Sequence, residues 1–148
     1  MVMRDIGDLP SRGRLLVDSA PIIYYLEDHP EFSTRYEKIF AGAEAGDYEL
    51  AITTVSLVEV LTGPLRKGNK TLAETYREAL TSPPGWRVVD LTPAIAYRAA
   101  RIRGETRLRT PDAIQLASAL EISCMGLVTQ DRDFRGFSKT SGKLDIYS

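Results

Sequence analysis

Short apolar runs alternate with longer segments of helical period along this chain of 148 residues. Runs such as "RLLV" (14–17) have the length and continuous hydrophobicity of a strand that is buried on both faces. Segments such as "TLAETYREAL" (71–80) repeat apolar residues every three or four positions, which is typical of an amphipathic helix. The alternation predicts one α/β domain in which helices cover both faces of a mostly parallel sheet.

The same pattern predicts the extent of each element. We expect strands at residues 14–18, 48–54, 86–91, 126–130 and 143–148, and helices at 19–29, 34–47, 55–63, 69–82, 93–106 and 111–123. The helix over 55–63 is expected to stop at Gly63-Pro64, because a proline inside a helix removes a backbone hydrogen bond. Residues 1–13 are expected to form a short N-terminal leader before a single domain over 14–148.

The composition narrows the class of protein. Nineteen basic and twenty acidic residues nearly cancel, so nucleic-acid binding would need a local basic patch. The single cysteine, Cys124, excludes an intramolecular disulfide and fits a reducing compartment. No apolar stretch approaches the roughly 20 residues that span a bilayer, and the first residues do not resemble an export signal. We therefore expect a cytoplasmic protein with no membrane partner.

The chain has one histidine, His29, in "EDHPEF". A Ser-His-Asp triad, a pair of catalytic histidines or a histidine-rich zinc site would each need more than this residue. We expect His29 to lie in solvent at a helix end. Hydrolytic chemistry in this protein would therefore depend on carboxylates and a metal ion.

Two acidic groups follow strands of the expected sheet. Asp18 ends the first strand, and "LVTQDRDF" places Asp131 and Asp133 directly after a later one. In open α/β sheets, functional residues gather outside the carboxyl ends of the strands, so these side chains are expected to meet. Thr129 points to the same place, where it would hydrogen-bond a carboxylate or hold a metal-bound water.

Two further acids occur in helices. Glu59 lies in the apolar stretch "VSLVEVL", where an unpaired buried carboxylate is costly and needs a partner or a metal. The alternative is that Glu59 faces solvent. "LTPAIA" and "RTPDAI" both suggest a Thr N-cap followed by Pro, but only the second continues with an acid, Asp112. Capping therefore does not require Asp112, although a favourable interaction with the helix dipole remains an alternative explanation.

These acids have no histidine or cysteine beside them in the sequence. Oxygen ligands without soft ligands select Mg²⁺ or Mn²⁺ over Zn²⁺. A divalent ion would offset the repulsion between crowded carboxylates and activate water for attack on a phosphodiester.

Four motifs together resemble the acidic motifs of the PIN-domain nucleases, most closely the VapC-type toxins of toxin–antitoxin pairs. They are, in chain order, "LLVDSAPIIYYLE", "TTVSLVEVLTG", "TPDAIQLASAL" and "LVTQDRDF", and the resemblance covers about 14–147. It implies a PIN-like fold, with a five-stranded sheet of order 3-2-1-4-5, and a ribonuclease that uses Mg²⁺, with Mn²⁺ as a substitute. It also implies a catalytic and metal-binding quartet, Asp18, Glu59, Asp112 and Asp131, with Thr129 and Asp133 as auxiliary residues.

The resemblance implies partners as well: an RNA substrate, a homodimer and a cognate antitoxin that blocks the acidic pocket. Gln115 departs from the family pattern, since an apolar residue is commoner at that position. The segment "YRAARIRGETRLRT" leads into Asp112, and its Arg103, Arg107 and Arg109 either bind RNA phosphates or form a solvated face.

Other classes of protein fit the motifs less well. A receiver-type phosphotransfer domain needs an Asp after a middle strand, where this chain has "AITT", and a haloacid-dehalogenase-like phosphatase needs an Asp where Ala20 stands. A PIN-fold module that binds RNA or a partner without cutting remains the alternative, although loss of acids is its usual mark.

Overall fold

The computed structural model describes residues 3–82, 86–136 and 144–148. Its five strands form one parallel sheet of order β3-β2-β1-β4-β5, which confirms the predicted fold class and strand order. The strands are β1 (Gly13–Val17), β2 (Tyr48–Thr53), β3 (Arg87–Val89), β4 (Gly126–Val128) and β5 (Asp145–Tyr147). Lys143, where the last strand was expected to begin, lies outside the described residues.

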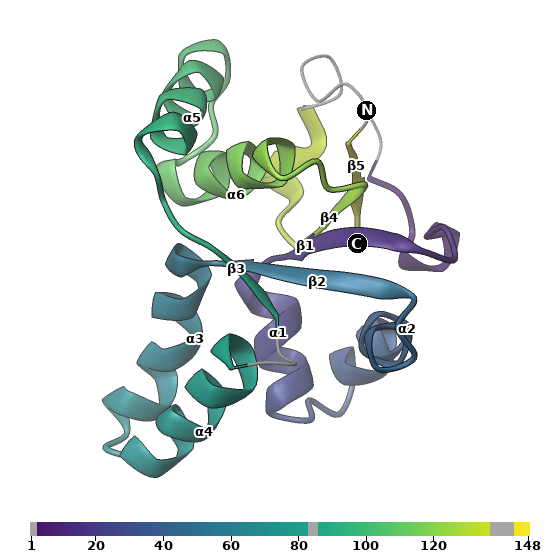
Figure 1. Cartoon of the computed structure of the whole chain (residues 1–148), viewed down its shortest axis with the longest axis vertical. Coiled ribbons are helices and arrows are strands. Elements are labelled where there is room, and N and C mark those ends of the chain that lie inside the picture. The colour runs from purple at the N-terminus through teal and green to yellow at the C-terminus, as the bar shows by residue number, and fades with distance from the viewer. Residues whose placement is uncertain (1–2, 83–85, 137–143) are drawn as a thin grey trace.

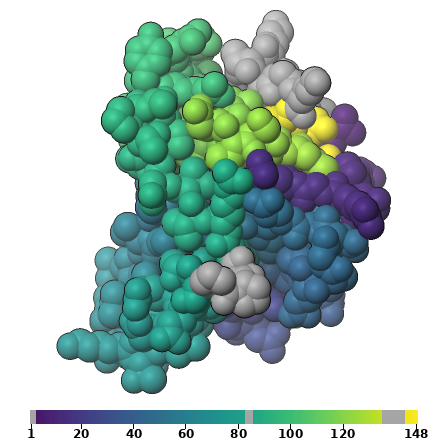
Figure 2. Space-filling view, viewed as in Figure 1, coloured from purple at the N-terminus to yellow at the C-terminus, as the bar shows by residue number. Residues whose placement is uncertain are grey.

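In the described part of the chain, six α-helices cover the two faces of this sheet (Figure 1). Helices α1 to α4 lie on one face and α5 and α6 on the other, and the space-filling view shows the same two layers (Figure 2). The helices are α1 (Ser19–Leu26), α2 (Phe32–Glu44), α3 (Thr54–Arg66), α4 (Lys70–Thr81), α5 (Pro93–Glu105) and α6 (Thr110–Glu121).

The core has one hydrophobic cluster on each face, because successive side chains of a strand point to opposite sides. Leu15 and Val17 of β1 pack with α1 to α4, whereas Leu16 between them packs with α5 and α6. All three are fully buried. The strands therefore form a fixed base from whose carboxyl ends the loops and helix starts project.

Helix α3 is longer than predicted. It continues through Pro64 to Arg66, so the expected stop at Gly63-Pro64 is wrong. Pro64 is buried, and this packing offsets the backbone hydrogen bond that proline cannot donate. The helix ends where Gly68 adopts a φ of +73°, and Asn69 then caps α4 by accepting the N–H of Leu72 at 3.1 Å.

The described part of the N-terminal leader packs against the domain. Ile6 and Leu9 are buried in the cluster beneath α1 and α2. The N–H of Arg4 donates to the carbonyl of Ile146 at 2.8 Å, so this segment lies beside β5. A short 3₁₀ helix (Ile6–Asp8) and another after β4 (Arg132–Gly136) were not predicted. Among the described helices, none has the length and hydropathy needed to cross a membrane.

Candidate active site

Asp18 follows β1 and caps α1 at the carboxyl edge of the sheet. Its Oδ1 accepts the backbone N–H of Ser19 at 2.8 Å and the side-chain amide of Gln115 at 2.9 Å. Its Oδ2 accepts the hydroxyl of Thr129 at 2.8 Å. Three donors from three separate segments therefore hold one carboxylate.

Thr129 connects the two strand ends. Its hydroxyl, which is fully buried, donates to Asp18 and accepts the N–H of Asp131 at 3.0 Å. Asp131 Oδ1 in turn accepts the N–H of Asp133 at 2.8 Å, which begins the 3₁₀ turn. Strands β1 and β4 are parallel neighbours with Val17 opposite Val128, so the residues that follow them meet as the sequence led us to expect.

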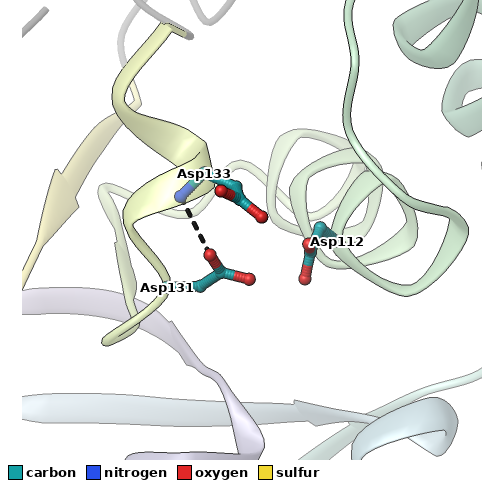
Figure 3. A group of neighbouring side chains, drawn as sticks. All are labelled: Asp112, Asp131 and Asp133. Atoms are coloured by element: carbon teal, nitrogen blue, oxygen red, sulfur yellow. Dashed lines mark hydrogen bonds between the residues drawn. The ribbon is translucent and has the colours of Figure 1, made fainter.

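Asp112 lies in the first turn of α6 and faces the segment that follows β4 (Figure 3). Carboxylate oxygens of Asp112, Asp131 and Asp133 all lie within 4.8 Å of one another. Within the described part of the chain, Asp112 Oδ2 is buried without a hydrogen-bond partner. Burial, followed by the charge of Asp131 and then that of Asp18, raises the pKa of Asp112 to about 7, while Arg109 opposes the shift.

The expectation that a threonine caps both Thr-Pro helix starts is wrong for α6. Thr92 caps α5 by accepting the N–H of Ile95 at 3.2 Å, as predicted. Helix α6, however, already includes Thr110, and the residue at its N-cap position is Arg109, which makes no side-chain cap. The two Thr-Pro helix starts therefore differ in whether a threonine caps them. The feature that sets Asp112 apart from an ordinary residue of a helix start is its buried Oδ2, which has no hydrogen-bond partner among the described residues.

Glu59 is exposed, so its expected place among buried apolar residues is also wrong. The buried face of α3 is formed by Ser56, Val60 and Pro64. Glu59 nevertheless points into the site, where its Oε2 accepts the hydroxyl of Ser19 at 3.1 Å. Partial loss of solvent around the carboxylate raises the pKa of Glu59, the Ser19 hydrogen bond lowers it, and the charge of Asp18 raises it further.

A pocket of about 450 Å³ joins these groups. Asp18, Glu59, Asp112 and Asp131 all line it, together with Tyr24 and Arg109 among others. Neither histidine nor cysteine occurs among the described residues of its wall. The oxygen-only donor set and the unpartnered oxygen of Asp112 fit a hard divalent cation. Asp133 is exposed, and one of its carboxylate oxygens lies within 4.8 Å of oxygens of Asp112 and Asp131.

The arginines of the basic segment differ in their contacts. Arg109 lines the pocket, and Arg107 is exposed beside it in the sequence. The Nε of Arg103 donates to the carbonyl of Leu108 at 3.2 Å and so fixes the loop between α5 and α6. Arg103 therefore has a structural contact that the other two positions do not share in the described residues.

His29 is half-buried, so the expectation of a solvated residue is wrong. Its Nδ1 accepts the N–H groups of Glu31 and Phe32, both at 3.2 Å, at the start of α2. Its ring also packs edge-on against Tyr24 at a centroid distance of 5.1 Å. The imidazole therefore stabilises the start of α2 and packs against Tyr24, which lines the pocket.

Two site residues, Ser19 and Gln115, were not identified from the sequence. Ser19 binds Glu59, and Gln115 binds Asp18. The sequence carries a signal for Gln115, because it is the one long polar side chain in the run "AIQLASAL". A buried amide of this kind needs partners.

The fold and the pocket define an α/β protein with a carboxylate site at the carboxyl ends of parallel strands. A family model for the PIN domain matches residues 15–140, and the chain belongs to this family. No curated protein matches the chain significantly.

Several solved structures have the same fold. A chain of a toxin–antitoxin complex from Klebsiella pneumoniae is 29% identical, with a TM-score of 0.63 over 83% of this chain and 92% of that chain. A chain of VapBC2 from Rickettsia felis, bound to a promoter DNA fragment, is 15% identical, with a TM-score of 0.69 over 91% and 98%. VapC20 of Mycobacterium tuberculosis, a toxin that cleaves the sarcin–ricin loop, is 15% identical, with a TM-score of 0.66 over 86% and 97%.

Proposed function

We propose that this chain is a divalent-metal-dependent endoribonuclease that acts as the toxin of a type II toxin–antitoxin pair. The observation that carries the proposal is the group of carboxylate oxygens of Asp112, Asp131 and Asp133, which lie within 4.8 Å of one another beside a buried, unpartnered oxygen of Asp112. Membership of the PIN domain family and the 29% identity to a chain of a toxin–antitoxin complex support the choice of activity and partner.

Asp112, Asp131 and Asp133 would hold the cation together with Asp18, and Glu59 lines the same pocket. Mg²⁺ is the expected ion, and Mn²⁺ would replace it. When bound, such an ion supplies positive charge that favours deprotonation of water and offsets charge on a phosphoryl group.

The residues around the cluster have separate tasks in this proposal. Asp18 is held in one orientation by its three donors, so it presents a fixed negative charge to the pocket. Glu59 lines the same pocket and would accept a proton from water there, and the partial burial that raises its pKa favours this uptake. Arg109, on the pocket wall, would bind an RNA phosphate, and Arg107 would bind the next.

The proposed partners are a cognate antitoxin that covers the acidic pocket and a second copy of the chain. Sedimentation of the purified protein tests the homodimer. Co-purification with the product of an adjacent small gene for a DNA-binding protein tests the antitoxin. A monomer would remove the dimer from the proposal and leave the catalytic part in place.

Removal and return of the metal tests the catalytic part. The purified protein is treated with EDTA, dialysed and incubated with end-labelled RNA before and after addition of Mg²⁺ or Mn²⁺. We expect no cleavage without the ion and cleavage with it. RNA binding without cleavage at any ion concentration would favour the alternative, an inert PIN-fold binding module. Cleavage that persists in EDTA would contradict metal dependence.

A further inference from the structure

Gln115 is a buried amide in α6, three residues after Asp112, and only 1% of its surface is exposed. Its Oε1 accepts the hydroxyl of Thr53 at 2.9 Å. Its Nε2 donates to Asp18 Oδ1 at 2.9 Å and to the hydroxyl oxygen of Ser56. Because an ionised carboxylate only accepts hydrogen bonds, the contact with Asp18 determines which end of the amide carries the nitrogen.

These hydrogen bonds form a chain that runs in one direction. The N–H of Ser56 donates to the hydroxyl of Thr53 at 3.0 Å, Thr53 donates to Gln115, and Gln115 donates to Asp18. This series of hydrogen bonds starts in the first turn of α3, at the positive end of the helix dipole, and its first three residues are buried. Consecutive bonds of this kind polarise one another, so the last one is strengthened at the carboxylate.

The same series of hydrogen bonds also joins the elements that carry Asp18, Glu59 and Asp112. Ser56 precedes Glu59 by three positions on α3, and Asp112 precedes Gln115 by three positions on α6. Residues three apart on a helix are neighbours on its surface. One amide therefore links α3 and α6 to Asp18 at the end of β1.

The donors of Asp18 are not shared equally between its oxygens. Oδ1 accepts from Ser19 and from Gln115, which uses both of its lone pairs, whereas Oδ2 accepts from Thr129 alone. We propose that Gln115 is a positioning residue, which holds Asp18 so that Oδ2 is the oxygen offered to a cation in the pocket. This inference rests on the metal-dependent function proposed above.

Mn²⁺ binding by metal-free variants tests the role of Gln115 without reference to activity. Gln115→Met keeps the length and helix propensity of the side chain but removes both polar ends. Thr53→Val is the matched control, because it removes a buried hydrogen bond of the same amide and leaves the donor to Asp18 in place. Free Mn²⁺ is measured by electron paramagnetic resonance, and unfolding temperature is measured for each protein.

We expect both variants to be destabilised. Only Gln115→Met should bind Mn²⁺ more weakly, by about 10- to 100-fold, because this is the usual loss when a residue that orients a metal ligand is removed. If Gln115→Met does not fold, Gln115→Asn replaces it, because its shorter amide stays polar but cannot reach Asp18, and the same loss is expected. Wild-type Mn²⁺ affinity in either Gln115 variant, or an equal loss in Thr53→Val, would overturn the positioning role. A wild-type protein that binds no Mn²⁺ would instead overturn the metal-dependent function, and the positioning role with it.

Discussion

A carboxylate oxygen of Asp112 lies within 4.8 Å of one of Asp131, although the first residue begins α6 and the second follows β4. Neither strand pairing nor a salt bridge between the two segments accounts for this approach of like charges in the described residues. The raised pKa of Asp112, about 7, means that a proton relieves the repulsion in the metal-free protein. A bound cation would relieve the same repulsion between the two carboxylates once the proton has left.

The first prediction concerns the pH dependence of stability. Asp112 has a pKa of about 7 in the folded protein against 3.8 for an unperturbed group, so the folded state holds a proton that the unfolded state has lost. The stabilisation is therefore complete below about pH 4 and is lost as pH rises through 7. Relative to Asp112→Asn, the metal-free wild type should lose stability across this range in thermal unfolding.

The control for this prediction is the metal ion. Saturating Mn²⁺ should stabilise the wild type more than Asp112→Asn at pH 8, because a ligand that binds only the folded state stabilises it. A difference between the two proteins that does not vary with pH would contradict the raised pKa of Asp112.

The second prediction concerns Thr129. Thr129→Val keeps the shape of the side chain but leaves the N–H of Asp131 and one oxygen of Asp18 without their partner. We expect the free energy of unfolding to fall by about 1–3 kcal/mol and Mn²⁺ affinity to fall with it. Thr129→Ser retains the hydroxyl, so it should keep the metal affinity. Equal Mn²⁺ affinity in the valine and serine variants would show that the hydroxyl has no part in the site.

The third prediction separates the arginines. Arg107→Ala and Arg109→Ala together should weaken RNA binding and reduce the salt dependence of the binding constant by about 0.7 for each phosphate that the protein no longer binds. The exposed Arg77, on α4, serves as a control in Arg77→Ala, because it pairs with Glu74 on the same helix. Fluorescence anisotropy over a salt series gives the slopes. Identical slopes in the wild type, the double variant and the control would assign the basic segment to a solvated face.

The fourth prediction concerns the single histidine. His29→Ala removes the acceptor of two N–H groups at the start of α2, which should cost about 1 kcal/mol and lower the unfolding temperature by about 2–4 °C. RNA cleavage at 25 °C should be unchanged, since no imidazole is needed at the acids. A large loss of cleavage in a folded variant would give His29 a role in the chemistry.

The meeting of Asp18 with Asp131 was predictable, because it depends on local and regular features. Apolar runs locate the strands, and parallel strands place their carboxyl ends at one edge of the sheet. The start of α5 was predictable for a similar reason, since the hydroxyl of Thr92 caps the N–H three residues along.

The surroundings of the acids were not predictable, because they depend on contacts between distant segments. Gln115 binds Asp18 across 97 positions and Thr53 across 62, and no periodic pattern reports such pairs. The exposure of Glu59 depends on which face of α3 meets the sheet. The passage of α3 through Pro64 depends on burial that outweighs the local preference of proline.

RNA cleavage by Asp18→Asn tests the central claim most directly. The substitution keeps the size of the side chain and removes a negative charge from the pocket, and purification in parallel with the wild type controls for contaminating ribonuclease. We expect the variant to fold as the wild type does, by circular dichroism, and to cleave RNA about 100-fold or more slowly at saturating Mn²⁺. Cleavage by the folded variant at the wild-type rate would contradict the assignment of the acidic pocket as the site of RNA hydrolysis.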